Sequence, residues 1–599
     1  MNKGRKHRRG GRNRHKGKAG GGGEAAEEPE AEVEEGAGGP TVEETAAAAA
    51  EAVDAASNAA QVAASAGVSL QQSQPARTET KPKAKAPSTK TADRLTDDPG
   101  VTEGLMLPEE RAFVVKNSDI MGRYLVAARD LEPGEVIICE EPLVVGPSQA
   151  FKPFCLGCYQ RIEDDGRPAF RCERCGWPLC GRACRGAGAA GGHSAAECSA
   201  WAAAGLRGRG PPAPLAYQAV MALRCLLLRD ARPDAWRRLS QMESHNEIRR
   251  KLPELWRHNQ AVVVERIRED WKMADRFTED EIHTVCGILE VNSFEVGQHG
   301  TRALFPTAFL LAHDCVPNTS HSDDTDDFSL TVRAAHAIKR GQPITLSYAY
   351  TLQGTLKRRE HLRESKFFDC ACARCADATE LGTQVSALKC PKCPRGFLLS
   401  SAPLDAHAPW RCGGAAACGF VLDAHSVRLL VDRINEELET VDANDVRALE
   451  AFLKKYRNVL HSHHYLALSA KHSLAQLYGK AQGYTIHELS DELLARKRDI
   501  CRELVRVFDV LEPGLTRLRG ICLYELHAPL LILATRGFEA RAIAPKELAA
   551  RLQEVVACLE EAARILALEP DTSTEGIMGQ AAADALLRMR DWHRAVDAL

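Results

Sequence analysis

The chain has 599 residues, of which 44% are hydrophobic and 27% charged, and its formal net charge at pH 7 is −3. This length allows several hydrophobic cores, and the usual domain size predicts about three to five units. The composition excludes a small disulfide-linked scaffold, because 21 cysteines in so long a chain, many at C-x2-C spacing, indicate metal sites instead.

No segment of the sequence is typical of a membrane-spanning or secreted protein. No apolar stretch approaches the roughly 18 to 20 residues that span a bilayer. The Lys- and Arg-rich amino terminus also lacks the apolar core of a signal peptide. We therefore expect an intracellular protein.

Residues 1–105 form an arm of biased composition. A basic block runs from Lys3 to Lys18, and a tract rich in Ala, Gly and Glu then leads into a linker rich in Pro, Lys and Thr. Neither block has enough large apolar residues to offset the entropy of folding, so we expect disorder. The basic block is equally consistent with a solvated tail and with an arm for nuclear import or non-specific nucleic-acid contact.

Residues 106–150 change to a strand pattern. Apolar runs at Phe113–Val115, Tyr124–Ala127 and Val136–Ile138 are separated by polar residues and by a Glu-Pro-Gly turn at 132–134. This alternation predicts a series of short β-strands.

Residues 151–200 carry the strongest signal, a zinc-finger pattern. Eight potential ligands stand in four pairs: Cys155, Cys158, Cys172, Cys175, Cys180, Cys184, His193 and Cys198. A segment so rich in Gly cannot fold by burial alone, and eight ligands fit two tetrahedral zinc ions. Because both ligand sets would be closed to water, we expect structural rather than catalytic zinc.

Residues 201–285 are predicted to form a helical insert, since apolar residues recur at helical spacing between Pro214 and Ile288. We expect this insert to pack the finger against the β-strands. It carries no chemistry of its own in this interpretation.

Residues 286–352 contain the stretch around which the chain is organised. A buried segment, Leu310–Asn318, precedes an acidic turn, Asp323–Asp327, and a further strand, Gly341–Tyr350, ends in two tyrosines. The acidic turn could attract a basic substrate, although a hairpin loop is the commoner explanation. A tyrosine pair two residues apart on a strand is likewise more often packing than catalysis.

Residues 353–378 add a cysteine cluster. Cys370, Cys372 and Cys375 lie within six residues, and with Cys315 they predict one structural zinc site. Without a metal, three thiols so close together would be open to oxidation.

Residues 385–422 predict a fourth zinc site, of the ribbon type. Its candidate ligands are Cys390, Cys393, Cys412 and Cys418. The first two stand at the usual C-x2-C spacing, whereas the second pair is more widely spaced than usual.

Residues 426–599 are helical by their apolar period. Successive amphipathic helices of this length suggest an array of α-hairpins like a degenerate tetratricopeptide stack. We expect the histidines at 461, 463 and 464 to be surface or capping residues, because no cysteine or carboxylate clusters with them.

The order of these segments resembles the SET and MYND family of protein-lysine methyltransferases, over about Arg111 to Leu599. The segments that carry the resemblance are Met121–Ala127, Ile288–Phe294, His313–Asn318, Gly341–Tyr350 and the two cysteine clusters. The added ribbon is most similar to the arthropod, SmydA-type members. The resemblance implies an α+β multidomain fold: a SET-type β fold split by a zinc-binding MYND finger, with an all-α, tetratricopeptide-like C-terminal domain.

By this resemblance the methyl donor is S-adenosylmethionine, Tyr348 is catalytic, and Tyr350 walls the channel for the target lysine. The implied cofactor-binding residues are Gly122, Arg123, Tyr124, Asn292, His313, Asn318 and Tyr348. Asn292 taken alone could equally be a turn residue. The sequence departs from the family pattern at Tyr124, where a second glycine is usual, and at Ala312, where asparagine is usual.

The resemblance also implies how the finger is assembled and what it binds. One zinc ion would be held by Cys155, Cys158, Cys180 and Cys184, and the other by Cys172, Cys175, His193 and Cys198. Spacing alone leaves this pairing open. In the family, such fingers dock short proline-rich peptides, which are pre-ordered in an extended conformation.

Two functions of different classes follow. The first is a protein-lysine N-methyltransferase that modifies histone or non-histone proteins in transcriptional regulation, in the nucleus and the cytoplasm. The second, motivated by Tyr124 and Ala312, is a scaffold with little turnover that recruits partners as a co-repressor or chaperone-linked adaptor. In both cases we expect a monomer without a membrane partner.

Overall fold

The structure is a computed structural model that describes residues 111–148, 154–162, 170–188, 192–208, 214–297, 300–413 and 418–594, with the backbone of 94–95 and 595–597. The arm expected at 1–105 lies outside the described residues, apart from the short strand β1 (Arg94–Leu95), which pairs with β2.

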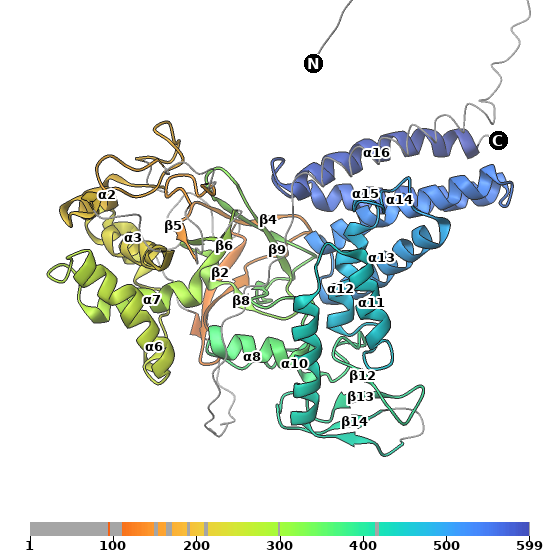
Figure 1. The fold of residues 1–599 in the computed structure, drawn as a ribbon, viewed down its shortest axis with the longest axis horizontal. Helices are drawn as coiled ribbons and strands as arrows, with labels where there is room; N and C mark the ends of the chain where they lie inside the picture. The colour runs from red at the N-terminus through yellow and green to blue at the C-terminus, as the bar shows by residue number, and fades with distance from the viewer. Residues whose placement is uncertain are drawn as a thin grey trace, which may run out of the picture. The chain divides into compact units, whose positions relative to one another are not determined.

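Strands from both sides of the finger segment pair with one another (Figure 1). The strands are β2 (Phe113–Ser118), β3 (Gly122–Ala127), β4 (Val136–Glu140), β5 (Val144–Pro147), β6 (Phe294–Val296), β7 (Thr301–Leu304), β8 (Ala312–His313), β9 (Thr319–Asp323), β10 (Leu330–Ala334) and β11 (Thr345–Leu346). β2 and β3 form an antiparallel hairpin, while β4 pairs with β10 and β5 with β7. The chain before the finger therefore forms sheets with the chain after the helical insert.

The finger and the insert share one apolar core with these strands. Their helices are α2 (Ala195–Ala203), α3 (Tyr217–Ala231), α4 (Pro233–Leu239), α5 (Asn246–Arg249), α6 (Pro253–Asn259) and α7 (Glu279–Asn292). α3 is buried along most of its length, and α7 begins at a capping box in which Thr278 and Glu281 bond each other's backbone. The finger, the insert and the strands thus share a single hydrophobic core.

A second core combines the ribbon with the C-terminal helices. After α8 (Thr355–Ser365) and α9 (Ala373–Ala376), four strands form one antiparallel sheet in chain order: β12 (Leu388–Lys389), β13 (Phe397–Ser400), β14 (Trp410–Cys412) and β15 (Val421–Leu422). The last segment is an array of helices: α10 (Ala424–Thr440), α11 (Val446–Tyr456), α12 (Tyr465–Leu477), α13 (Asp491–Leu511), α14 (Arg517–Glu539), α15 (Pro545–Leu566) and α16 (Thr574–Asp597).

Consecutive helices of this array pack on one another, most extensively from α13 to α16 (Figure 1). Among the described residues, α14 is the one helix whose length and composition would suit a membrane span, contrary to our expectation that no apolar stretch approaches that length. Because 67% of its apolar window is buried inside the molecule, its apolar character is that of a core helix.

The turn between α13 and α14 joins the helical array to the strands. The backbone N–H of Leu515 donates to the carbonyl of Ala335 at 2.8 Å, and the Thr351 hydroxyl donates to Glu512. Gly514 has a φ of +83°, and a Cβ at this position would clash with the Ala335 carbonyl. The glycine is therefore required both by the backbone conformation and by the close approach.

Candidate active site and metal centres

β8 pairs with β11 as two parallel strands, with Ala312 opposite Thr345 and His313 opposite Leu346. The side chain of Asn318 stabilises this strand pair. Its amide nitrogen donates to the Pro343 carbonyl at 2.8 Å, and its oxygen accepts from the Thr345 backbone N–H at 2.8 Å. These bonds hold the two segments in a fixed register.

The pairing of β8 with β11 places His313 against Tyr348. The Tyr348 backbone N–H donates to His313 Nδ1 at 2.9 Å, and the two ring centroids are 5.2 Å apart. Burial lowers the pKa of His313 to about 4, so the imidazole is neutral at pH 7. Because Nδ1 accepts, the remaining proton lies on Nε2, which is 3.2 Å from the sulfur of Cys315.

Tyr348 is half-buried, and its hydroxyl donates to the carbonyl of Leu311. Burial raises the pKa of this phenol, so it remains protonated at neutral pH. On one side of the ring lies Lys366, whose Nζ is 5.8 Å from the ring centroid. Tyr350, in contrast, is 49% exposed. The structure thus places Tyr348 inside the site and Tyr350 at the surface.

β3 passes along the segment that leads into Tyr348, since the Ile344 N–H donates to the Leu125 carbonyl at 2.9 Å. Gly122 begins this strand with a φ of +64° and has open space where a Cβ would stand. Arg123 donates to the Gln241 carbonyl, and Tyr124 is 4% exposed. Gly122 can therefore offer its backbone to a ligand, whereas Tyr124 is largely buried.

Asn292 ends α7 and connects it with the segment 241–245. Its amide donates to the Glu243 and Ile288 carbonyls, each at 2.9 Å. His245 in this segment has a φ of +49° and makes an edge-to-face contact with Phe367 at 5.6 Å. Sequence reasoning missed this segment, because nothing in its spacing distinguishes it from an ordinary helical loop.

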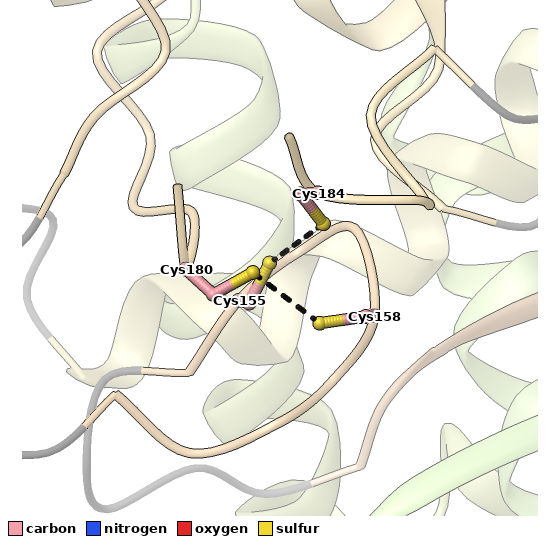
Figure 2. A group of neighbouring side chains, drawn as sticks. All are labelled: Cys155, Cys158, Cys180 and Cys184. Carbon is pink, nitrogen blue, oxygen red and sulfur yellow. Dashed lines mark hydrogen bonds between the residues drawn. The ribbon is translucent and has the colours of Figure 1, made fainter. Parts of the chain in front are cut away.

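The first metal cluster of the finger comprises Cys155, Cys158, Cys180 and Cys184, whose sulfurs all lie within 4.8 Å of one another. Figure 2 shows the four side chains converging, with Cys155 and Cys184 sulfurs 3.4 Å apart and those of Cys158 and Cys180 3.7 Å apart. Zn–S bonds of about 2.3 Å at tetrahedral angles would place sulfurs about 3.8 Å apart. The donor set therefore fits zinc.

The second finger cluster comprises Cys172, Cys175, His193 and Cys198. These two sets are the ones that the resemblance implies. His193 Nε2 is 3.4 Å from the Cys175 sulfur, while Nδ1 is 2.9 Å from a Glu197 oxygen. The carboxylate thus directs Nε2 toward the metal position.

Glu197 belongs to a buried network that supports this histidine. Both of its oxygens accept from Arg224, at 2.5 and 2.9 Å, and Arg224 also donates to the Val145 carbonyl at 2.8 Å. Although burial opposes ionisation, Arg224 and His193 hold the pKa of Glu197 below its usual value. Glu197 lies in the first turn of α2, four residues after the ligand His193, and this spacing was a signal that could have revealed it.

The third cluster comprises Cys315, Cys370, Cys372 and Cys375. Arg358, which is fully buried, donates to the sulfurs of Cys315 and Cys375 at 3.3 and 3.5 Å. Glu380 pairs with Arg358 at 2.6 Å and with Arg374 at 3.0 Å. Arg358 therefore bonds two sulfurs of the cluster and the buried Glu380 together, an arrangement that cysteine spacing alone could not reveal.

The fourth group contains Cys390, Cys412 and Cys418. Cys393 stands outside this mutually close set, although we predicted it as the fourth ligand. Its sulfur and that of Cys412 still lie beside Gly396, at 2.9 and 2.5 Å from where a Cβ would stand. Gly396 thus leaves room for both sulfurs, and the ribbon has three converged thiols with a fourth nearby.

The sequence is similar to those of known SET-domain proteins. The SET domain family model matches residues 122–349. The Drosophila melanogaster SET domain-containing protein SmydA-8, isoform B, is 33% identical over 322 residues, which cover 52% of this chain and 68% of the relative. The chain belongs to the SMYD-related SET-domain proteins.

Other relatives match shorter parts of the chain. Human protein-lysine N-methyltransferase SMYD4 is 35% identical over 135 residues, covering 22% of this chain and 16% of the relative. Arabidopsis thaliana histone-lysine N-methyltransferase ASHR1 is 25% identical over 282 residues, covering 45% of this chain and 56% of the relative. The SET domain of the present protein is therefore homologous to those of protein-lysine N-methyltransferases, and its Cys and His clusters could bind zinc.

Proposed function

We propose that this SMYD-related protein is a protein-lysine N-methyltransferase that uses S-adenosylmethionine. The observation that carries the proposal is the parallel pairing of β8 with β11, which fixes Tyr348 against a neutral His313. A neutral imidazole suits this position, because a protonated one would repel the positively charged sulfonium of the donor.

The cofactor, when bound, supplies an electrophilic methyl group. We propose Gly122, Arg123, Asn292, His313 and Asn318 as the residues that would hold it. The open backbone at Gly122 fits close approach of a ligand, and Asn318 already makes the bonds that keep its segment in register.

Tyr348 would act on the target amine. Its phenol stays protonated and is oriented by the Leu311 carbonyl, so the oxygen is fixed while it can still accept from an amine N–H. A lysine that enters this half-buried site loses water, which lowers its pKa and favours the neutral, nucleophilic form. Holding that amine in one orientation lowers the entropic barrier to transfer.

The substrate class is a protein with an accessible lysine. We extend the proposal to histone or non-histone substrates, transcriptional regulation, and a location in nucleus and cytoplasm. Proline-rich peptides at the finger and phosphate contact by the basic arm belong to the same proposal, and the arm lies outside the described residues.

The metal clusters would each hold one structural zinc ion. In the first three clusters the four sulfur or imidazole donors leave no coordination position for water, so these ions would support folding rather than chemistry. We expect metal analysis to give about four zinc ions per chain. A value near three would instead point to the ribbon, where Cys393 lies apart from the other thiols.

The test of catalysis is Tyr348→Phe in the full chain. Loss of one oriented hydroxyl, about 1 to 1.5 kcal/mol, should lower methyl transfer from labelled S-adenosylmethionine to a lysine peptide array by about tenfold. Tyr456→Phe, which removes a hydroxyl bonded to Glu437 in the helical array, is the matched control and should keep full transfer. Equal activity of both variants would refute the role of Tyr348.

A second candidate function is a scaffold with little turnover. Two observations favour it: the buried side chain of Tyr124 at the start of β3, and the Lys366 amine on the face of Tyr348. In that case Cys198→Ser, which breaks a finger cluster, would abolish partner recruitment, whereas Tyr348→Phe would change nothing. A phenotype confined to the tyrosine variant would reject the scaffold.

A further inference from the structure

Lys366 makes three contacts that converge on its amine. The Nζ atom lies 2.8 Å from the Val291 carbonyl oxygen and 3.2 Å from that of Glu290. On another side it faces the ring of Tyr348 at 5.8 Å. Lys366 follows α8 and precedes the third cysteine cluster, so two fixed elements hold its backbone in place.

The two carbonyls belong to the last turn of α7, which ends at Asn292. Carbonyls in the last turn of a helix have no partner within the helix, and they lie at the negative end of its dipole. An aromatic face also attracts a cation within about 6 Å of the ring centroid. All three groups therefore favour one kind of ligand, a primary ammonium.

A simple helix cap would account for the carbonyls but not for the rest of the arrangement. Phe367, directly after Lys366, has a φ of +63°, and its ring contacts His245, which has a φ of +49°. A non-glycine residue in this left-handed region costs about 1 to 3 kcal/mol. Both partners of this ring contact therefore have left-handed backbones, and one of them directly follows Lys366 in the chain.

We propose that the Glu290 and Val291 carbonyls and the face of Tyr348 form a receptor for an alkylammonium group, which Lys366 fills until the lysine of a substrate displaces it. Identifying the displacing group as a target lysine rests on the proposed function. The binding of an ammonium at this position does not.

The test removes the internal ligand and supplies a small one. Lys366→Ala lacks three methylenes and the amine, and n-propylammonium replaces those atoms. We expect n-propylammonium chloride to raise the Tm of the zinc-loaded Lys366→Ala chain saturably, with half-saturation on the order of millimolar for so small a ligand. Wild type and Lys366→Met, in which the space is filled, should show no saturable rise, and 1-propanol should have no effect on any of the three.

Equal shifts in all three proteins, or none in Lys366→Ala, would overturn the proposal. Because this readout needs neither cofactor nor turnover, an absence of methyl transfer would leave it unaffected. Conversely, a failed propylammonium titration would leave the proposed catalysis standing. A stable methyl group on Lys366 after incubation of wild type with S-adenosylmethionine would also contradict its role as a displaceable occupant.

A second measurement uses wild type and remains valid if Lys366→Ala does not fold. A brief pulse of an amine-acylating reagent should label Lys366 severalfold more slowly than Lys339, whose side chain is 68% exposed. In Tyr348→Leu the labelling of Lys366 should accelerate while that of Lys339 stays constant. An unchanged rate at Lys366 would show that the tyrosine face contributes nothing and would overturn the three-part receptor.

Discussion

Glu197→Gln should weaken zinc binding at the second finger cluster more than any exposed substitution in the finger. The carboxylate is completely buried, and its two oxygens accept from His193 and twice from Arg224. Glutamine keeps the shape but removes the charge and turns one oxygen into a donor. One Arg224 bond is then lost, and a buried guanidinium remains without its counter-charge.

The size of the effect has two parts. Removing one partner of a buried ion pair costs about 3 to 5 kcal/mol of stability. Loss of the carboxylate that orients a ligand histidine lowers metal affinity by about 10- to 100-fold, or about 1.4 to 2.7 kcal/mol. The second part acts on the finger, whereas Arg224 lies on α3 in the core shared with the strands, so Glu197→Gln should lower both the zinc affinity and the stability of the chain in urea.

The assay is zinc release to a chromogenic chelator, followed by urea unfolding of the same samples. The matched control is Glu173→Gln, because Glu173 pairs with Arg182 in the same finger but both side chains are mostly exposed, at 65% and 82%. An exposed pair contributes at most about 1 kcal/mol. If both variants kept their zinc equally, Glu197 would not be the residue that orients His193.

Three further predictions concern other parts of the chain. Gly514→Ala should destabilise the chain by about 1 to 3 kcal/mol in urea, because an Ala at φ +83° is strained and its Cβ meets the Ala335 carbonyl. Arg358→Met should release zinc from the third cluster and cost about 3 to 5 kcal/mol, because its guanidinium bonds the Cys315 sulfur and its loss leaves a buried carboxylate with one partner fewer. Burial lowers the pKa of His472 to about 4. The neutral imidazole therefore contributes its full share to the folding stability above about pH 6.5, and this share is lost as the pH falls toward 4. His472→Gln should therefore flatten the acid side of the stability profile by up to about 3 kcal/mol, measured as Tm against pH.

Each of these has its own control. Gly483→Ala shares a positive φ of +77° but has open space, so it should cost less than Gly514→Ala. Arg363→Met removes a mostly exposed pair with Asp369 and should leave the zinc content intact. A stability profile in His472→Gln that still fell steeply between pH 6.5 and 4 would mean that other groups dominate the acid response.

The zinc clusters were the most predictable part of the molecule. Structural zinc sites are built mostly from Cys and His, often in closely spaced pairs that the local sequence shows. Of the 16 predicted ligands, 15 lie in the four groups that the structure brings together. Cys393 is the exception. Cys315 and Cys370 are separated by β9, β10, β11 and α8, so the fold of these elements is what brings the two sulfurs together.

The supporting residues were much harder to predict. Arg358 and Glu380 are separated in sequence, and their role depends on being buried together, which no periodicity records. Lys366 reads as an ordinary charged residue until the fold brings its amine to Tyr348. Local patterns therefore revealed the ligands, while charge partners that meet only through tertiary packing remained invisible.

Binding of S-adenosylmethionine tests the central claim most directly. We predict that calorimetric titration of the full, zinc-loaded chain gives a saturable heat with one cofactor per chain. Asn318→Ala loses the amide hydrogen bonds that join the two segments after β8 and before β11. Its affinity for the cofactor should therefore be about tenfold lower than that of the wild type. No heat at high micromolar cofactor, with four zinc ions bound, would contradict a methyltransferase site at Tyr348.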